Sequence, residues 1–108
     1  MSGIDDRRKA MEAKLHQDGE LKFKVNNRRN KLLGLWLAEQ FGLTGDEAAE
    51  YAKTVVLSDF EEPGDEDVLR KVLADIEAKS ARIDEATVRK QMEVLLDTAK
   101  DEIFSQGD

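Results

Sequence analysis

The sequence predicts an all-α protein: a four-helix bundle that follows a mobile amphipathic N-terminal segment. The first observation is that apolar residues recur at helical spacing in four stretches, at about residues 20–41, 45–60, 65–79 and 85–104. The second is that the 108 residues include one Pro and no run that alternates apolar and polar residues as a strand does. The third is that the connections between these stretches are short, which favours antiparallel neighbours in one bundle. We therefore expect one domain, with a flexible segment at residues 1–19 and the bundle at residues 20–108.

The N-terminal segment has few apolar side chains, and they share one helical face. Ile4, Met11 and Leu15 stand at i, i+7 and i+11, and charged residues fill the remaining positions. Lone helices of this length are marginal in water, and Gly19 weakens continuity with the next helix. We expect residues 1–18 to be disordered in the free protein and helical on a partner. An ordinary frayed terminus is the alternative.

The stretch at 20–41 carries the most apolar block of the chain and its only Trp. Leucines surround Trp36 so closely that the C-terminal half of this helix is apolar nearly all round, which predicts burial in the bundle core. Gly34 inside this block indicates close approach of a neighbouring helix. Gly42 suits the left-handed residue that ends a helix.

Helix starts are marked in two of the other stretches. Thr44 and Glu47 fit a capping box, in which the Thr hydroxyl accepts from the Glu amide. Asp84 is placed to accept from an amide at the start of the last helix. Between these starts, Pro63 disfavours a helical residue before it, which predicts a short connection there.

Charge is distributed unevenly along the chain. The net charge of −7 combines +4 over residues 1–31 with −11 over residues 32–108. A basic arm on an acidic body indicates an acidic partner for the arm, although a solvated basic helix face explains the same pattern. The acidic body would repel phosphates, so we expect no nucleic-acid partner, with a small RNA-associated protein as a distant alternative.

Composition limits the cellular compartment that we expect for the chain and the chemistry that its side chains can perform. The chain has no Cys, which excludes disulfides and thiolate chemistry. The N-terminus lacks the apolar run of a signal peptide, and the block Leu32–Leu37 is too short to span a membrane. We therefore expect a cytoplasmic protein that does not insert into a membrane.

No motif in the sequence points to an enzyme or a metal site. His16 is the only His, and nothing in the sequence fixes a partner that would hold it as a general base. A phosphate-binding glycine loop is missing, and the acids at 61–67 lack the ligand spacing of a calcium loop. We expect no catalytic residues and no metal ligands.

Basic residues of the second stretch form a candidate anion site. Side chains three or four positions apart share a helix face, so several of these cations can reach one phosphate by charge-assisted hydrogen bonds. A nucleotide or RNA would fit this chemistry, and a solvated basic face is the alternative. The candidate nucleotide-binding residues are Lys22, Lys24, Arg28, Arg29, Lys31 and Trp36.

Several of these motifs resemble one known family. The run Arg-Arg-Asn-Lys-Leu-Leu-Gly-Leu-Trp at 28–36, the run Asp-Gly-Glu-Leu-Lys-Phe-Lys at 18–24 and the run Asp-Val-Leu-Arg-Lys-Val-Leu-Ala-Asp at 67–75 are similar to the zeta subunit of the F-type ATP synthase of alphaproteobacteria. The resemblance covers nearly the whole chain. It implies a four-helix bundle with a mobile inhibitory N-terminus and an inhibitor of an ATPase, not an enzyme.

The resemblance also implies partners and a mechanism. The N-terminal segment would enter the catalytic head between the alpha, beta and gamma subunits, become helical there and block rotation in the hydrolysis direction. The chain would be cytoplasmic and peripheral at the inner membrane through the ATP synthase, with no required cofactor and with ADP or ATP as a regulatory ligand. Combined with the helical face described above, the expected inhibitory residues are Ile4, Arg7, Arg8, Met11, Lys14 and Leu15.

Three positions depart from the family pattern. Met11 and Leu15 stand where family members carry Phe, and Arg8 replaces a residue that is often acidic. Aromatic side chains are the better anchors in a partner pocket, although Met and Leu still contribute about 1.5–3 kcal/mol each when fully buried. The sequence therefore predicts the family's mode of inhibition with a weaker apolar anchor.

Overall fold

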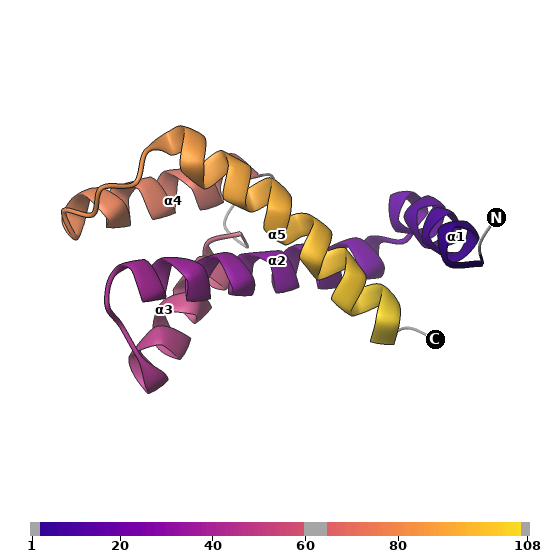
Figure 1. Ribbon diagram of the computed structural model, residues 1–108, viewed down its shortest axis with the longest axis horizontal. Helices are drawn as coiled ribbons and strands as arrows, with labels where there is room; N and C mark the ends of the chain where they lie inside the picture. Colours follow the sequence, from indigo (N-terminus) through magenta and orange to yellow (C-terminus); the bar gives the residue numbers. More distant parts are fainter. Residues whose placement is uncertain (1–2, 60–64, 107–108) are drawn as a thin grey trace.

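The chain consists of five α-helices in the computed structural model, which describes the backbone of residues 3–59 and 65–106 and the side chains of residues 8–59 and 65–105. No strand occurs in these ranges, so the predicted all-α class is confirmed. The helices follow one another as Figure 1 shows: α1 (Gly3–Gln17), α2 (Gly19–Gln40), α3 (Gly45–Ser58), α4 (Asp65–Ala78) and α5 (Glu85–Gln106). The last four lie within two residues of the predicted stretches.

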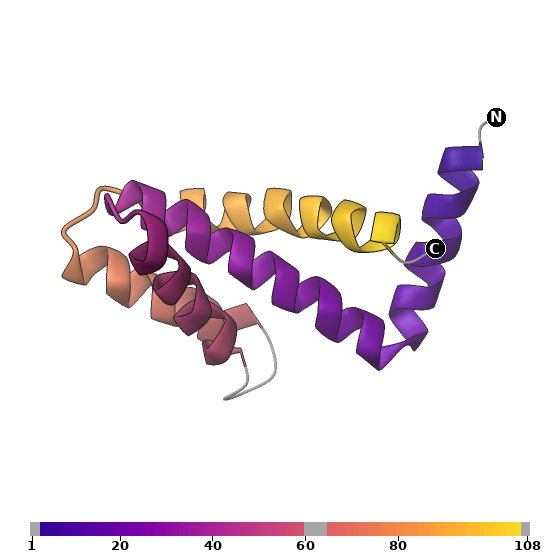
Figure 2. The same ribbon diagram turned by 90° about the horizontal axis from the view of Figure 1, so that it is seen from below.

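The main core lies where α2, α3, α4 and α5 meet. It is built from β-branched residues, leucines and one Met that are almost completely buried, because each helix turns one apolar face inward. Its buried members are Leu33, Leu37, Val55, Val68, Leu69, Val72, Ile76, Val88 and Met92. Helices α2 and α5, both of 22 residues, run side by side and extend beyond this core (Figures 1 and 2).

A second core cluster lies at the far ends of α2 and α5. It joins Val25 of α2 to Ala99, Ile103 and Phe104 of α5, and Leu15 of α1 completes it. Leu15 is 8% exposed, which places α1 on the body at this end. Figure 2 shows α1 turned away from the axis of α2 and standing at the end of the molecule.

Helix α1 is the element that departs from the predicted architecture. The sequence predicts four helices and a segment that becomes helical only on a partner. In the structure residues 3–17 already form a helix. The physical reason is that Leu15 finds apolar partners on α2 and α5, and packing of this kind stabilises helices that are marginal in isolation. That the segment is mobile stays a prediction.

Helices α2 and α3 approach each other at Gly34. A Cβ atom on Gly34 would lie 2.5 Å from Cα of Ala52 and 3.2 Å from a methyl group of Val55. No side chain fits at the first of these distances, so the predicted close approach at Gly34 is confirmed. The turn that joins the two helices has Gly42 at φ +80°, the predicted left-handed conformation.

The helix starts agree with the sequence at one predicted position and differ at another. Asp84 accepts a 2.8 Å hydrogen bond from the Thr87 amide, as predicted. Thr44 stands at the N-cap of α3, but its hydroxyl accepts no amide hydrogen bond, so the predicted capping box is wrong. Its carbonyl oxygen accepts from the Glu47 amide instead.

Asp18 caps α2, which the sequence analysis did not predict. Its carboxylate accepts from the amides of Glu20 and Leu21 at 3.0 and 3.2 Å, and its own amide donates to the carbonyl of Lys14 in α1. One residue therefore ends α1 and begins α2. Within the described chain, no helix is long and apolar enough to cross a membrane.

Candidate functional site

One face of α1 is applied to the body. Leu15 is buried among Val25, Ala99 and Ile103, and the half-buried Met11 packs against the same cluster one turn earlier. Two of the predicted inhibitory residues are therefore brought together, because positions i and i+4 lie on one helix face. The cluster that receives them belongs to α2 and α5.

Arg8 continues this face with a charged contact. Its guanidinium donates to Asp97 at 2.7 Å and to Asp101, and it stands over the ring of Phe104 with 5.4 Å to the ring centroid. Desolvation opposes its charge, but the two carboxylates outweigh this and raise the pKa of Arg8. A pair of opposite polarity lies nearby, where Nζ of Lys100 approaches the carboxylate of Glu12 at 3.2 Å.

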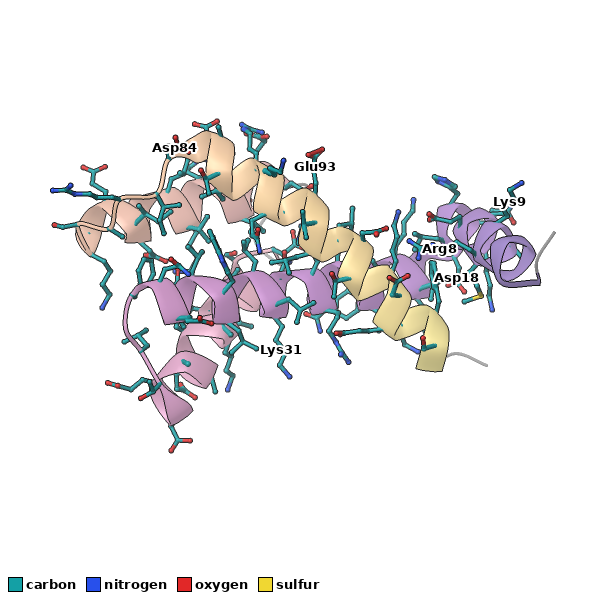
Figure 3. The ribbon with its side chains drawn as sticks, in the orientation of Figure 1. Arg8, Lys9, Asp18, Lys31, Asp84 and Glu93 are labelled. Carbon is teal, nitrogen blue, oxygen red and sulfur yellow. The ribbon has the colours of Figure 1, made fainter. Side chains whose placement is uncertain are left out.

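Lys14, another predicted inhibitory residue, is not part of this contact. The side chain of Lys14 is exposed, as Lys9 is in the side-chain view of Figure 3. The side chains of Ile4 and Arg7 lie outside the described part of the structure. In the described part of α1, the apolar residues and Arg8 therefore contact the body, whereas Lys9 and Lys14 are exposed to solvent.

A groove along α2 is lined by three of the predicted nucleotide-binding residues. Its volume is about 360 Å³. Lys24, Arg28 and Lys31 lie along it at spacings of four and three, which puts their side chains on one face. The groove is also lined by Phe23, Asn27, Val56 and Ile103.

Two of these cations already have carboxylate neighbours. Arg28 donates to Glu102 of α5 at 2.7 Å, with both side chains about one-third exposed. Lys24 approaches Glu20 at 3.7 Å in an exposed pair. Exposed pairs of this kind are weak, so an anion that contacts several cations at once can compete with them. Lys31 extends away from the ribbon in Figure 3.

The remaining predicted nucleotide-binding residues lie elsewhere. Lys22 is exposed and does not line the groove. Trp36 packs against the main core. Arg29 is 2% exposed. Its Nε donates to Asn30 and its Nη2 donates to Asp65, both at 2.7 Å. The structure therefore separates Lys22, Arg29 and Trp36 from the other three.

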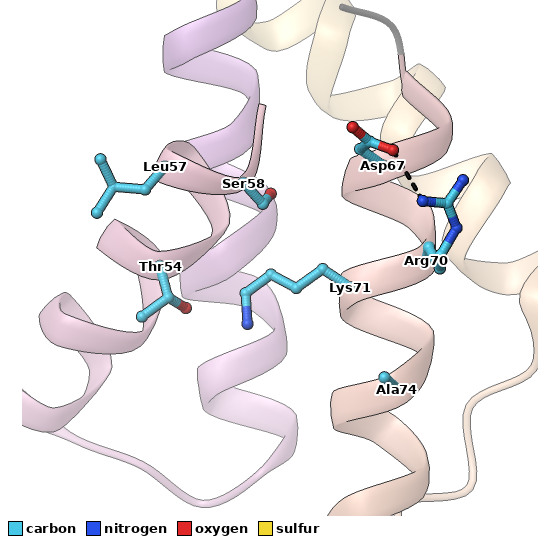
Figure 4. A pocket seen from close by; sticks show the side chains of 7 residues that line it. All are labelled: Thr54, Leu57, Ser58, Asp67, Arg70, Lys71 and Ala74. Atoms are coloured by element: carbon cyan, nitrogen blue, oxygen red, sulfur yellow. Dashed lines mark hydrogen bonds and ion pairs between the residues drawn. The ribbon is translucent and has the colours of Figure 1, made fainter. Parts of the chain in front are cut away.

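A larger hollow lies between α3 and α4, with a volume of about 480 Å³ (Figure 4). Its cations are engaged, since Arg70 donates to Asp67 at 2.9 Å and Lys71 donates to Asp75 at 2.7 Å. The hydroxyl groups of Thr54 and Ser58 both donate to backbone carbonyls of their own helix. Each polar group here has a partner within the protein, so the hollow offers little to a ligand.

The described residues were compared with the requirements of a metal site and of a general base. No group of three or more His, Asp or Glu residues in this part of the chain is placed to hold a metal ion. His16 is exposed on α1. A general base needs a neighbour that orients it, and no described hydrogen bond holds the imidazole.

The acids that receive Arg8 were missed in the sequence. Asp97 and Asp101 are spaced by four and therefore share one face of α5, but many exposed helix faces show this pattern. What distinguishes them is that α1 lies beside them, which is a tertiary relationship. Phe23 was also missed, although half of its surface is exposed at the groove.

Comparisons with known proteins found one family model and similar solved structures. A family model described as ATPase inhibitor subunit zeta matches residues 1–102. A solved structure, described as a solution NMR structure, is 50% identical with a TM-score of 0.71, and the match covers 80% of this chain and 98% of that chain. No curated protein matches the chain.

Proposed function

Because this chain belongs to the family of the ATPase inhibitor subunit zeta, we propose that it inhibits ATP hydrolysis by inserting α1 into the catalytic head of an F-type ATP synthase. The family supplies the inhibitory role. The insertion of α1 and its site between the alpha, beta and gamma subunits are the proposal. In this assembly the chain is peripheral at the membrane that carries the ATP synthase.

The observation that carries the proposal is the construction of α1. It is a 15-residue helix, connected to α2 along the chain by Asp18, and it stands at one end of the molecule (Figure 2). Met11 and Leu15 lie on one face and basic residues lie on another. A helix of this kind fits the helix-in-groove mode of recognition, in which apolar anchors enter a partner groove. Its exposed cations favour an acidic partner and speed association.

The decisive experiment compares the full chain with residues 19–108 as inhibitors of ATP hydrolysis by the cognate catalytic head. The full chain inhibits and the shortened chain does not, if α1 is the effector. Circular dichroism establishes whether the shortened chain keeps its helices. Equal inhibition by both chains would place the effector in the body, and inhibition by neither would refute the proposal.

A point-mutation test examines the face of α1 separately. Met11→Asp with Leu15→Asp places two carboxylates on the apolar face, and we expect inhibition to be lost. Ala10→Asp with Ala13→Asp adds the same charge to exposed positions of the same helix and serves as the matched control. Inhibition that survives in the first variant, or that is lost to the same extent in both, contradicts the apolar-face mechanism.

A second candidate function is an ADP- or ATP-responsive binding module. The observation that favours it is the groove on α2, because Lys24, Arg28 and Lys31 line it together and could share one phosphate chain. The nucleotide would act as a regulatory ligand, and inhibition does not require it.

Titration with ADP and ATP, followed by calorimetry and by NMR shifts, tests this second function. Arg28→Ala with Lys31→Ala removes two groove cations and should weaken binding about tenfold or more, since hydrogen bonds to charged groups contribute about 1.5–3 kcal/mol. Lys22→Ala with Lys9→Ala removes equal charge outside the groove and should leave affinity nearly unchanged. Equal losses of nucleotide affinity in the two double variants would show that the effect comes from net charge and not from the groove.

A further inference from the structure

The face of α1 that the proposed inhibition requires is the face that α5 covers. Met11 and Leu15 are packed into the cluster of Ala99, Ile103 and Phe104. A helix that buries these side chains against its own body does not present them to a partner groove. The body and the ATPase therefore compete for the same residues of α1.

The contact between α1 and α5 includes ion pairs as well as apolar packing. Asp97 and Asp101 stand one turn apart on α5 and both accept from the guanidinium of Arg8. Lys100, between them in sequence, faces Glu12 of α1. The signs alternate on both helices, so the pairs select one register of α1 against α5. The surface on α5 has the properties that the proposed partner site needs: acids for Arg8 beside an apolar cluster that contacts Met11 and Leu15.

We propose that the contact between α1 and α5 is a resting lock, in which α5 occupies the inhibitory face of α1 until the ATPase displaces it. This inference rests on the proposed inhibitory function of α1. The measured potency of inhibition is then the intrinsic affinity of α1 for the head reduced by the fraction of molecules in which α1 is released. Loosening the lock strengthens inhibition, and tightening it weakens inhibition.

The carboxylates of the lock offer a way to loosen it without changing α1. The side chains of Asp97 and Asp101 are 71% and 60% exposed and lie outside both cores. Asp97→Asn with Asp101→Asn removes their charge at constant shape. Two partly exposed ion pairs shift an equilibrium by roughly 2- to 30-fold in total, and we expect the half-inhibitory concentration to fall by a factor in this range.

A matched control separates the lock from overall charge. Glu77→Gln with Glu93→Gln makes the same change in net charge on α4 and α5, at exposed residues away from α1, and Figure 3 shows Glu93 at a distance from Arg8. We expect this control to keep the potency of the unmodified chain. Hydrogen exchange of the amides of residues 8–17 is measured in parallel on all three full-length proteins, and it should accelerate only in the Asp97/Asp101 variant.

The outcomes separate failure of the lock from failure of the proposed function. Unchanged exchange in the Asp97/Asp101 variant means that the ion pairs do not hold α1 and overturns the lock. Faster exchange with unchanged potency overturns it as well, because release of α1 then does not limit inhibition. If the unmodified chain does not inhibit, the proposed function fails and the lock falls with it, whatever the exchange data show.

A cross-link tests the opposite direction. The chain has no Cys, so Glu12→Cys with Lys100→Cys introduces the only two thiols, at positions whose native side chains already meet. A cleavable bis-maleimide that joins them should abolish inhibition, and cleavage of the linker should restore it. Full inhibition by the cross-linked chain would show that α1 acts without leaving α5 and would overturn the lock.

Discussion

Arg29 is 2% exposed and donates to Asp65, whose own side chain is 61% exposed. The pair joins the middle of α2 to the first residue of α4. The buried partner is the cation, and its Nε is held by Asn30 at 2.7 Å. Removal of the Asp65 carboxylate therefore leaves a buried cation, whereas removal of the Arg29 guanidinium leaves a carboxylate that is largely exposed to water.

We predict that Asp65→Asn is more destabilising than its exposure suggests. Removal of the carboxylate charge leaves the guanidinium of Arg29 buried without a counter-ion, at a cost of about 2–3 kcal/mol. Urea denaturation at neutral pH measures the loss in unfolding free energy. Glu66→Gln is the control, since Glu66 also lies in the first turn of α4 but approaches Arg89 only at 3.7 Å in an exposed pair, worth under about 1 kcal/mol. Similar losses in both variants would contradict the prediction.

Gly34→Ala should destabilise the protein although Ala is the better helix former. The added methyl group would meet Cα of Ala52 at 2.5 Å, so α2 and α3 must move apart. Overpacking of this kind costs about 1–3 kcal/mol, which exceeds the gain of about 1 kcal/mol in helix propensity. Thermal unfolding followed by circular dichroism gives the change.

Gly19→Ala provides the opposite expectation on the same helix. Nothing lies within 4 Å of a Cβ atom there, so the propensity gain is not opposed and a few tenths to about 1 kcal/mol of added stability follows. Stabilisation by both glycine substitutions would show that packing at Gly34 does not decide the result.

Tyr51 should resist ionisation in the folded protein. Its hydroxyl donates to Asp75 at 2.8 Å, and desolvation by burial together with this carboxylate raises the pKa of the phenol. The neutral form is favoured in the folded state, so the contribution of Tyr51 to stability is complete below about pH 10, the ordinary value, and falls as the pH rises above it.

The phenolate absorbance band tests this directly, because Tyr51 is the only Tyr of the chain. We expect the band to appear on alkaline titration only as the protein unfolds. Tyr51→Phe should lower stability by about 1 kcal/mol at neutral pH, through loss of one hydrogen bond, and should flatten the alkaline decline. Phenolate formation near pH 10 with the helical signal unchanged would refute the prediction.

Asp84 should make stability dependent on acid pH. Hydrogen bonds from Thr87, through its side chain and its amide, lower the pKa of the Asp84 carboxylate. The cap therefore stabilises the start of α5 above about pH 4, the ordinary value, and this contribution disappears as the pH falls through the lowered value. Asp84→Ala should lower the unfolding midpoint at pH 7 and change it less at acid pH. An equal effect at both pH values would contradict this role.

Local sequence patterns were sufficient to predict those features of the fold that depend on residues close together along the chain. The helical spacing of apolar residues located α2 to α5, and Gly34 and Asp84 disclosed a close contact and a cap. The prediction for Thr44 was wrong because a sequence pattern shows only that a side chain is able to cap a helix. In the structure the amide of Glu47 donates to the backbone carbonyl of Thr44 and not to its hydroxyl.

The candidate sites were harder to predict because they depend on which helix lies opposite. Arg28 and Arg29 are adjacent and chemically identical, yet the first lines a groove and the second is buried against Asp65. Successive residues of an α-helix point about 100° apart around its axis, so these two side chains have different surroundings. The docking of Arg8 on Asp97 depends on residues 89 positions apart, a relationship that periodicity along the chain does not contain.

The junction at Asp18 sets how far the N-terminal helix can reach. A helix of 15 residues is about 22 Å long, and a rotation about the single residue that joins it to α2 moves its tip much farther than its base. Asp18 keeps the first turn of α2 capped through Glu20 and Leu21, so the base is anchored. If α1 inserts as proposed, the near end of the body lies within about 22 Å of the point that the tip reaches. The length of α1 would then set how far from its insertion site the rest of the protein can bind the enzyme.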